Sequence, residues 1–299
     1  MHVRYLQVND FRSWEQADLP LDVGATVLLG ANGQGKTNLV EALGYLATLS
    51  SHRVANDALL IRKGSSRAVV RAAVVNAGRE LTIEVEITAG KANRARVNRG
   101  PVPRARDVLG ILRTVLFAPE DLTLVRGDPS ERRRFLDDLL VSRAPRYAGV
   151  RADYERVLRQ RNALLRSAAG GRKPNRSVDA VSGAVVSGDA ASGGREPNTL
   201  EVWDGHLALH GAQLLAGRLD LVADLAPHVS TAYAGVAPES QPVRLGYRCG
   251  LGDPLPEGYG VAGGERADTG VLTERFLASL AESRSAELER GASLVGPHR

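Results

Sequence analysis

The chain has 299 residues and a mass of 31.9 kDa, a length that corresponds to about two domains. Its composition, 43% hydrophobic and 24% charged, excludes a wholly disordered chain and a collagen-like or coiled-coil rod. The net charge of +5 suits a nucleic-acid partner without requiring one. The single cysteine, Cys249, excludes an internal disulfide, and we expect a cytoplasmic protein because neither a signal peptide nor a long apolar run is visible.

The N-terminal residues predict a strand, a loop and a helix. Residues 3–8 and 25–29 have the apolar character of strands, and residues 25–29 run directly into a glycine-rich loop. Apolar side chains then recur at helical spacing over residues 37–49. We therefore expect a strand, loop and helix unit of an α/β fold.

Further strands are expected after this helix. Residues 68–75 form an apolar strand, and residues 81–88 alternate apolar and polar side chains, which is the period of a half-solvated antiparallel strand. A turn at residues 89–93 predicts a hairpin into residues 94–97. Residues 114–117 predict one more short strand.

The pattern becomes helical near residue 126. Asp128 as N-cap, Pro129 at the first helical position and Glu131 in the first turn predict a helix start. The apolar face of this helix is expected to comprise Phe135, Leu136, Leu139 and Leu140. Pro145 ends it.

Two more helices are expected on either side of a linker. Apolar residues between 147 and 165 mark a second helix, and residues 167–198 are a flexible linker rich in Gly, Ser and Ala. Helical spacing resumes over residues 200–233, so the two helices are expected to form an antiparallel hairpin.

The C-terminal residues predict mixed structure. Residues 243–247 are a candidate strand, residues 250–264 a loop, and residues 271–290 another helix. Residues 293–299 have the character of a strand that begins and then stops.

One motif carries chemistry, the run Gly30-Ala31-Asn32-Gly33-Gln34-Gly35-Lys36-Thr37. It fits the phosphate-binding pattern G-x-x-x-x-G-K-[ST], in which glycine backbone N–H groups and a helix N-terminus surround phosphate oxygens. Lys36 would contact the β and γ phosphates, and the Thr37 hydroxyl would hold Mg²⁺. All eight residues are therefore predicted to bind ATP.

The acidic half of a nucleotide site is not recognisable. Hydrolysis needs an acidic residue at the end of an apolar strand to complete the Mg²⁺ site, and no segment fits. Asp220 and Asp224 come closest, but both lie inside a helical pattern. We therefore assign no catalytic residue in this chain.

Several motifs resemble a known family. Asn38 and Glu41, just after the phosphate loop, resemble the ABC-type heads of chromosome-maintenance and DNA-repair ATPases. Five further segments occur in the order found in the RecF family and span nearly the whole chain. They are residues 9–12 (NDFR), 117–122 (FAPEDL), 127–137 (GDP with RRRFLD), 160–165 (QRN with LL) and 296–299 (GPHR).

This resemblance implies a function in bacterial recombinational repair. RecF-like proteins bind ATP and DNA at single-stranded gaps and duplex junctions, cooperate with RecR and RecO in loading RecA, take part in replication and the SOS response, and hydrolyse ATP slowly. The resemblance also implies an ATP-dependent homodimer of two heads when the protein is full length. A serine-containing signature and the acidic strand are expected after residue 299, so we expect a truncated chain that binds ATP weakly and shows no turnover alone.

The expected architecture is an ABC-type P-loop ATPase head with a mostly helical second lobe. Residues 1–125 are expected to form the N-terminal part of the ATPase lobe, and residues 126–290 the helical lobe. Residues 291–299 would begin the return to the ATPase lobe. The alternative function is that of a P-loop kinase for a small molecule.

Five basic residues are candidates for DNA contact. Arg53, Arg62 and Lys63 follow the phosphate-loop helix, and Arg132 and Arg133 open a helix, where cations oppose the dipole unless an anion is near. A solvated surface is the alternative for the first three. A salt bridge to a neighbouring acid would satisfy Arg132 and Arg133 equally.

Overall fold

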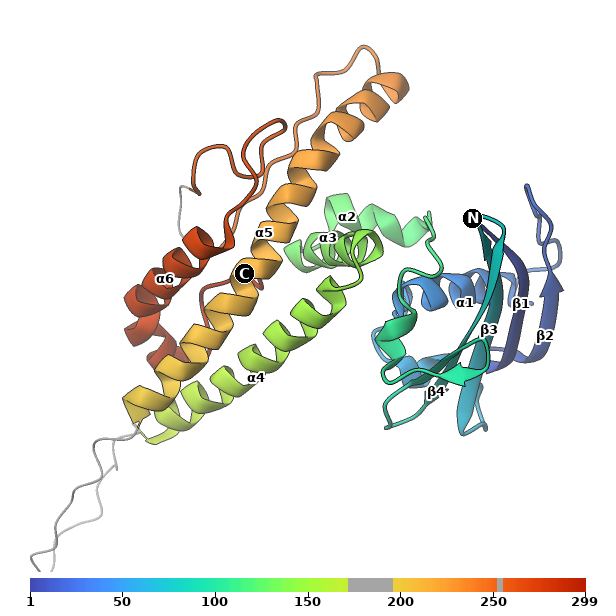
Figure 1. Cartoon of the computed structure of the whole chain (residues 1–299), viewed down its shortest axis with the longest axis horizontal. Helices are drawn as coiled ribbons and strands as arrows, with labels where there is room; N and C mark the ends of the chain where they lie inside the picture. The colour runs from blue at the N-terminus through green and yellow to red at the C-terminus, as the bar shows by residue number, and fades with distance from the viewer. Residues whose placement is uncertain (172–195, 252–254) are drawn as a thin grey trace, which may run out of the picture. The chain divides into compact units, whose positions relative to one another are not determined.

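The computed structural model describes residues 1–171, 196–251 and 255–299. The chain forms two compact units, Met1–Ala148 and Gly149–Arg299, which we call the N-terminal and C-terminal units (Figure 1). None of the described helices is long and apolar enough to cross a membrane.

The N-terminal unit is built on a six-stranded antiparallel sheet in the order β2-β1-β3-β4-β5-β6. The strands are β1 (His2–Phe11), β2 (Trp14–Pro20), β3 (Arg67–Asn76), β4 (Arg79–Thr88), β5 (Arg94–Val97) and β6 (Gly100–Pro101). The strands predicted over residues 3–8, 68–75, 81–88 and 94–97 are therefore confirmed. Side chains on one face, such as Val70 and Val85, are fully buried because strand residues alternate between the two faces.

Helix α1 (Lys36–Thr48) covers the buried face of this sheet, as Figure 1 shows. Leu39, Ala42 and Leu46 point into the core at the spacing that the sequence predicts. Tyr45 is buried with them, and its hydroxyl donates to Asp57 at 2.7 Å. Four short elements complete the unit's secondary structure before α3: the 3-10 helices η1 (Asp57–Leu60), η2 (Ala105–Val108) and η3 (Pro119–Leu122), and α2 (Thr123–Arg126).

Two predicted strands, residues 25–29 and 114–117, are wrong. Neither segment pairs with any described strand, and both are irregular. Several of their apolar side chains are exposed, 74% for Val27 and 88% for Leu29, although Leu28 packs against the core. An extended segment becomes a strand only when a neighbour satisfies its backbone N–H and C=O groups, and no described segment does so here.

Helix α3 (Pro129–Arg143) begins and ends where the sequence predicts, although the Asp128 side chain makes no capping hydrogen bond. Leu140 is buried, whereas Phe135 is exposed, so the predicted apolar face is only partly correct. The α3 residue Arg134 donates to the carbonyl of Ser51. This contact joins α3 to the rest of the N-terminal unit, which extends to Ala148.

The C-terminal unit contains α4 (Tyr147–Gly171), α5 (Glu196–Val236) and α6 (Thr269–Arg290), and α4 begins at the boundary between the units. Helices α4 and α5 run antiparallel, as predicted from their pattern (Figure 1). Gly211 on α5 faces the rings of Phe276 and Tyr154, and a Cβ there would be 3.1 Å from the Tyr154 ring. This glycine allows the helices to approach closely.

Three other expectations concern the C-terminal unit. Residues 243–247 are irregular, not a strand. Residues 293–299 are also not a strand, because side chains take the backbone donors that a ladder would use: Ser293 N–H donates to Asn162, and Leu294 N–H to Glu287, both at 2.7 Å. Of the predicted linker at 167–198, helices occupy both ends, and residues 172–195 lie outside the described residues.

Candidate nucleotide-binding site

The predicted phosphate loop is an exposed turn that leads into α1. Gly30, Gly33 and Gly35 have φ values of +151°, +84° and +87°. A Cβ on Gly35 would lie 2.5 Å from Ser13 Oγ and 2.7 Å from Trp14 Nε1. Both its left-handed conformation and this close approach require glycine.

The N-terminus of α1 is open to an anion. Gly35 caps the helix without any side-chain hydrogen bond, and no acidic residue lies in the first turn. The positive end of the helix dipole and its free N–H groups therefore face the loop. Thr37, the second helical residue, is exposed, so its hydroxyl is accessible to a cation. These features fit a nucleotide phosphate with its Mg²⁺.

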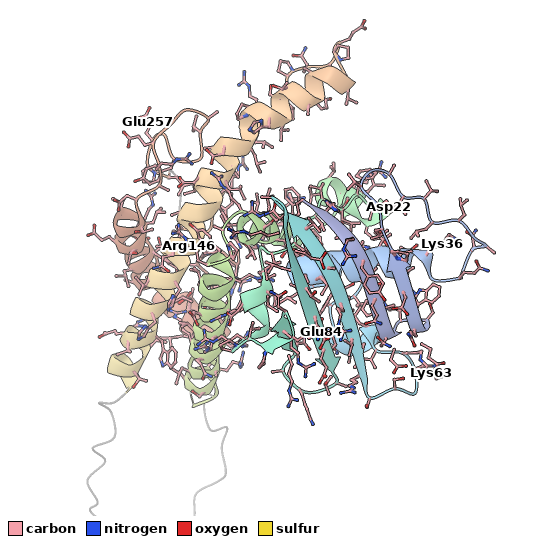
Figure 2. All side chains as sticks on the ribbon, turned by 45° about the vertical axis from the view of Figure 1, so that its right-hand side comes forward. Asp22, Lys36, Lys63, Glu84, Arg146 and Glu257 are labelled. Carbon is pink, nitrogen blue, oxygen red and sulfur yellow. The ribbon has the colours of Figure 1, made fainter. Side chains whose placement is uncertain are left out.

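Lys36 places a positive charge within the loop. Its Nζ donates to the carbonyl oxygens of Gly30 at 2.8 Å and Ala31 at 2.7 Å. Figure 2 shows Lys36 at the loop, away from Lys63. A phosphate bound at the helix N-terminus would meet this ammonium, which could exchange its carbonyl partners for phosphate oxygens.

The turn between β1 and β2 supports the end of the loop. The indole Nε1 of Trp14 donates to the Gly35 carbonyl at 3.0 Å, and Asn38 Nδ2 donates to Ser13 Oγ at 2.9 Å. These two hydrogen bonds hold the last glycine of the loop and the first turn of α1 against the sheet.

A buried carboxylate extends this support. Glu41 on α1 is fully buried and accepts two hydrogen bonds from Arg12, from Nε at 2.9 Å and from Nη2 at 2.6 Å. It also accepts from Ser51 Oγ at 2.5 Å, and Arg53 Nη1 lies 3.3 Å away. Burial would raise the pKa of Glu41, but the hydrogen bonds from Arg12 and Ser51 and the two nearby cations outweigh it and lower the pKa.

The backbone around Arg12 is strained. Asp10 and Arg12 have φ values of +49° and +56°, in the left-handed region that costs energy for non-glycine residues. Arg12 N–H donates to the Leu60 carbonyl at 2.7 Å, and Arg62 N–H to the Asp10 carbonyl at 2.8 Å. These bonds, with the Arg12–Glu41 ion pair, hold the strained turn beside the loop.

Most residues predicted to contact DNA already have partners within the chain. Arg53 binds Glu41 and donates to Asn38 Oδ1 at 2.9 Å. Arg62 binds Asp10 at 2.7 Å and thereby lowers the pKa of that carboxyl.

The remaining three candidates differ. Arg132 donates to the backbone carbonyls of Leu124 and Gly127 at the end of α2, at 3.3 and 3.1 Å. Lys63 is exposed and Arg133 half-buried, and neither has an ion pair within the described part of the chain.

The described ranges hold no group of three or more His, Cys, Asp or Glu side chains that could bind a metal ion. Asp220 and Asp224 lie on α5, where the helical pattern placed them, and both contact Arg266, at 4.0 and 2.8 Å.

Sequence reasoning missed Ser13 and Trp14. Trp14 contacts Gly35 across 21 residues of chain, and nothing in either local pattern signals this contact. The sequence points to Glu41 and Arg12 only through the family resemblance, in which Arg12 belongs to the segment 9–12. Phe11, from the same segment, is a fully buried core residue.

The comparisons with known proteins agree with this geometry. The model of the RecF/RecN/SMC N-terminal domain matches residues 2–280. The whole chain is 55% identical, over 306 aligned residues, to the DNA replication and repair protein RecF of Rhodococcus erythropolis, of which it covers 71%. The chain belongs to the RecF family.

Two solved structures share the RecF fold over the whole chain. Both are of the recombination mediator protein RecF in the RecFOR pathway, one with ATPrS and one with ATP. Their TM-scores are 0.82 and 0.79, each at 23% identity, and the chain covers 71% and 72% of them. The predicted α/β head with a mostly helical second lobe is therefore confirmed.

Proposed function

We propose that this RecF-family chain acts in DNA replication and repair as a DNA-binding protein that responds to ATP and Mg²⁺. The observation that carries the proposal is the 55% identity, over the whole chain, to a relative named for DNA replication and repair. The open helix N-terminus beside Lys36 supports the nucleotide part of the proposal. The comparisons offer no support for the kinase alternative.

In this proposal the residues from Gly30 to Thr37 hold the nucleotide. The loop N–H groups and Lys36 bind its phosphates, and the Thr37 hydroxyl contributes a ligand to Mg²⁺. The Arg12–Glu41 pair and Trp14 keep the loop in place. Bound ATP would act as a switch that changes the affinity for DNA.

The finer expectations stay proposals that rest on the family resemblance. They are binding at single-stranded gaps and junctions, cooperation with RecR and RecO in loading RecA, a part in the SOS response, and an ATP-dependent homodimer. A cytoplasmic location is consistent with the lone Cys249. We also predict weak ATP binding and no measurable turnover by this chain alone.

The test is binding of a fluorescent ATP analogue, with and without gapped DNA. We expect ATP to change the DNA affinity of the chain, and Lys36→Ala to abolish this effect because it removes the charge that meets the phosphates. Arg244→Ala, an exposed cation outside both the loop and the candidate DNA contacts, is the control and should behave as the unmodified chain. Coupling that survives Lys36→Ala would refute the switch. Turnover that disappears with Lys36→Ala would refute the prediction of no turnover.

A further inference from the structure

The positive charge of the chain is concentrated in one short segment of the N-terminal unit. Residues 91–106, which we call the basic edge, contain six basic and no acidic side chains, a net charge of +6 compared with +5 for the whole chain. The six are Lys91, Arg94, Arg96, Arg99, Arg104 and Arg106. The rest of the chain therefore carries no net positive charge.

The basic edge forms one side of the six-stranded sheet. It contains β5 and β6, the last two strands in the sheet order, and the start of η2, which contacts β5. The N–H of Val102 donates to the Ala95 carbonyl at 3.1 Å, so the chain returns alongside β5. Ala95 is buried, and because side chains alternate along a strand, Arg94 and Arg96 lie on the opposite, exposed face.

Acidic neighbours neutralise little of this charge. Arg96 binds Glu84 at 2.5 Å, but Glu84, labelled on the sheet in Figure 2, also binds Arg71. Glu86 lies opposite Arg94 in the register, yet its ion pair is with Arg67 at 3.3 Å.

The other five cations of the basic edge have no ion pair within residues 1–171, the described range that contains them. They are Lys91, Arg94, Arg99, Arg104 and Arg106; all but the half-buried Arg106 are exposed. The nearest acidic residue in the sequence, Asp107, accepts a hydrogen bond from the backbone N–H of Arg104 rather than from a guanidinium. The basic edge therefore carries five positive charges without an ion pair, four of them on exposed side chains.

We propose that the basic edge binds the phosphate backbone of duplex DNA. The inference rests on the proposed DNA-binding function and assigns a surface to it. Five of the six cations are arginines, whose planar guanidinium groups match phosphate oxygens. The segment has no aromatic side chain on which an unpaired base could stack, which favours the backbone of a duplex over a single strand. Such contacts position DNA without reading its sequence.

The experiment compares two triple variants of the full chain. The first variant removes half of the positive charges of the basic edge, by Arg94→Gln, Arg99→Gln and Arg104→Gln together. The control removes three exposed arginines outside it, none of which has an ion pair among the described residues: Arg126→Gln, Arg244→Gln and Arg290→Gln. Both variants lose the same charge, so the comparison separates a surface from a net-charge effect.

Binding is measured by the anisotropy of a labelled blunt duplex and of labelled oligo(dT), over a salt series with ATP and Mg²⁺. Each lost phosphate contact lowers the slope of log K against log salt by about 0.9. We expect the basic-edge variant to lose up to about 2.7 from the duplex slope, and the control to keep the slope of the unmodified chain. Affinity for a fluorescent ATP analogue should be unchanged in both and checks that the N-terminal unit is folded.

Three outcomes would overturn the inference. An equal loss of duplex affinity in both variants would show a net-charge effect. A loss of affinity confined to oligo(dT) would contradict the proposal that the basic edge binds duplex DNA. A basic-edge variant that binds duplex as the unmodified chain does would also overturn the inference but leave the proposed function standing. Failure of the unmodified chain to bind any DNA at low salt would overturn both.

Discussion

In the N-terminal unit, Glu41 is buried beneath Arg12 and Arg53, whose side chains remain 17% and 35% exposed. In the C-terminal unit the cation itself is buried: Arg161 is fully inaccessible and binds Glu287 and Asp204, each at 2.6 Å. Burial would lower the pKa of Arg161, but its two carboxylate partners outweigh this and raise the pKa.

The two clusters connect to different parts of the molecule. Glu41 and Asn38 both lie on α1, the helix that begins at the predicted phosphate loop, and Arg53 contacts both of them. The Arg161 cluster joins α4, α5 and α6 and also binds Ser293 Oγ at 2.8 Å. The comparison teaches that one cluster supports the helix of the proposed nucleotide site, whereas the other fixes the packing of three helices.

The largest expected effect is on the buried Arg161 cluster. Arg161→Met should lower the free energy of unfolding of the C-terminal unit by about 3–5 kcal/mol, because Glu287 would remain buried without its cation and Asp204 would keep only Arg284. Urea denaturation followed by the emission of Trp203, in a Trp14→Phe chain, measures this. Arg284→Met, which removes a partly exposed partner of Asp204, should cost about 1 kcal/mol or less. Equal costs would show that burial of Arg161 is not the cause.

The second prediction concerns the cluster beside the phosphate loop. Glu41→Gln should lower the free energy of unfolding of the N-terminal unit by about 2 kcal/mol, because it removes charge-assisted hydrogen bonds from Arg12 and Ser51. It should also weaken ATP binding. Trp14 emission in a Trp203→Phe chain reports both effects. Glu80→Gln, the exposed partner of Arg4, is the control and should change neither by much.

The pH dependence of Glu41→Gln sharpens this prediction. The pKa of Glu41 is lower in the folded chain than its ordinary value of 4.5. A depressed carboxylate pKa adds stability above the unfolded pKa, and this stability is lost as the pH falls through the folded pKa. The difference in unfolding free energy between the unmodified chain and Glu41→Gln should therefore shrink as the pH is lowered from neutral to below about 4. A constant difference would contradict an ionised Glu41.

The smallest effect is expected at Trp14. Trp14→Phe keeps an aromatic ring but removes the hydrogen bond to the Gly35 carbonyl, which should cost about 1 kcal/mol of stability. ATP affinity should fall several-fold if this bond positions the loop. In the Trp203→Phe chain, ATP should also change the emission of Trp14. Unchanged affinity in Trp14→Phe would assign the indole to packing alone.

Local patterns predicted the elements that contain their own signal. The phosphate loop and α1 follow from one contiguous motif and from helical spacing over residues 37–49. The alternation over residues 81–88 predicted β4, since a strand with one buried face needs that period. Residues 25–29 and 114–117 are also apolar, as strands are, but they are irregular. A strand also needs a neighbouring strand to pair with, and the local sequence does not show whether one is present.

The sequence by itself determined the RecF resemblance, the position of the phosphate loop and most helices, since each depends on residues that are adjacent or one helical turn apart. Only the tertiary structure decided which cations are paired. Arg62 meets Asp10 across 52 residues, whereas Arg94 lies opposite Glu86 in the sheet without an ion pair to it. The physical reason is that an ion pair depends on which side chains the fold brings within a few ångströms, and sequence distance does not constrain this.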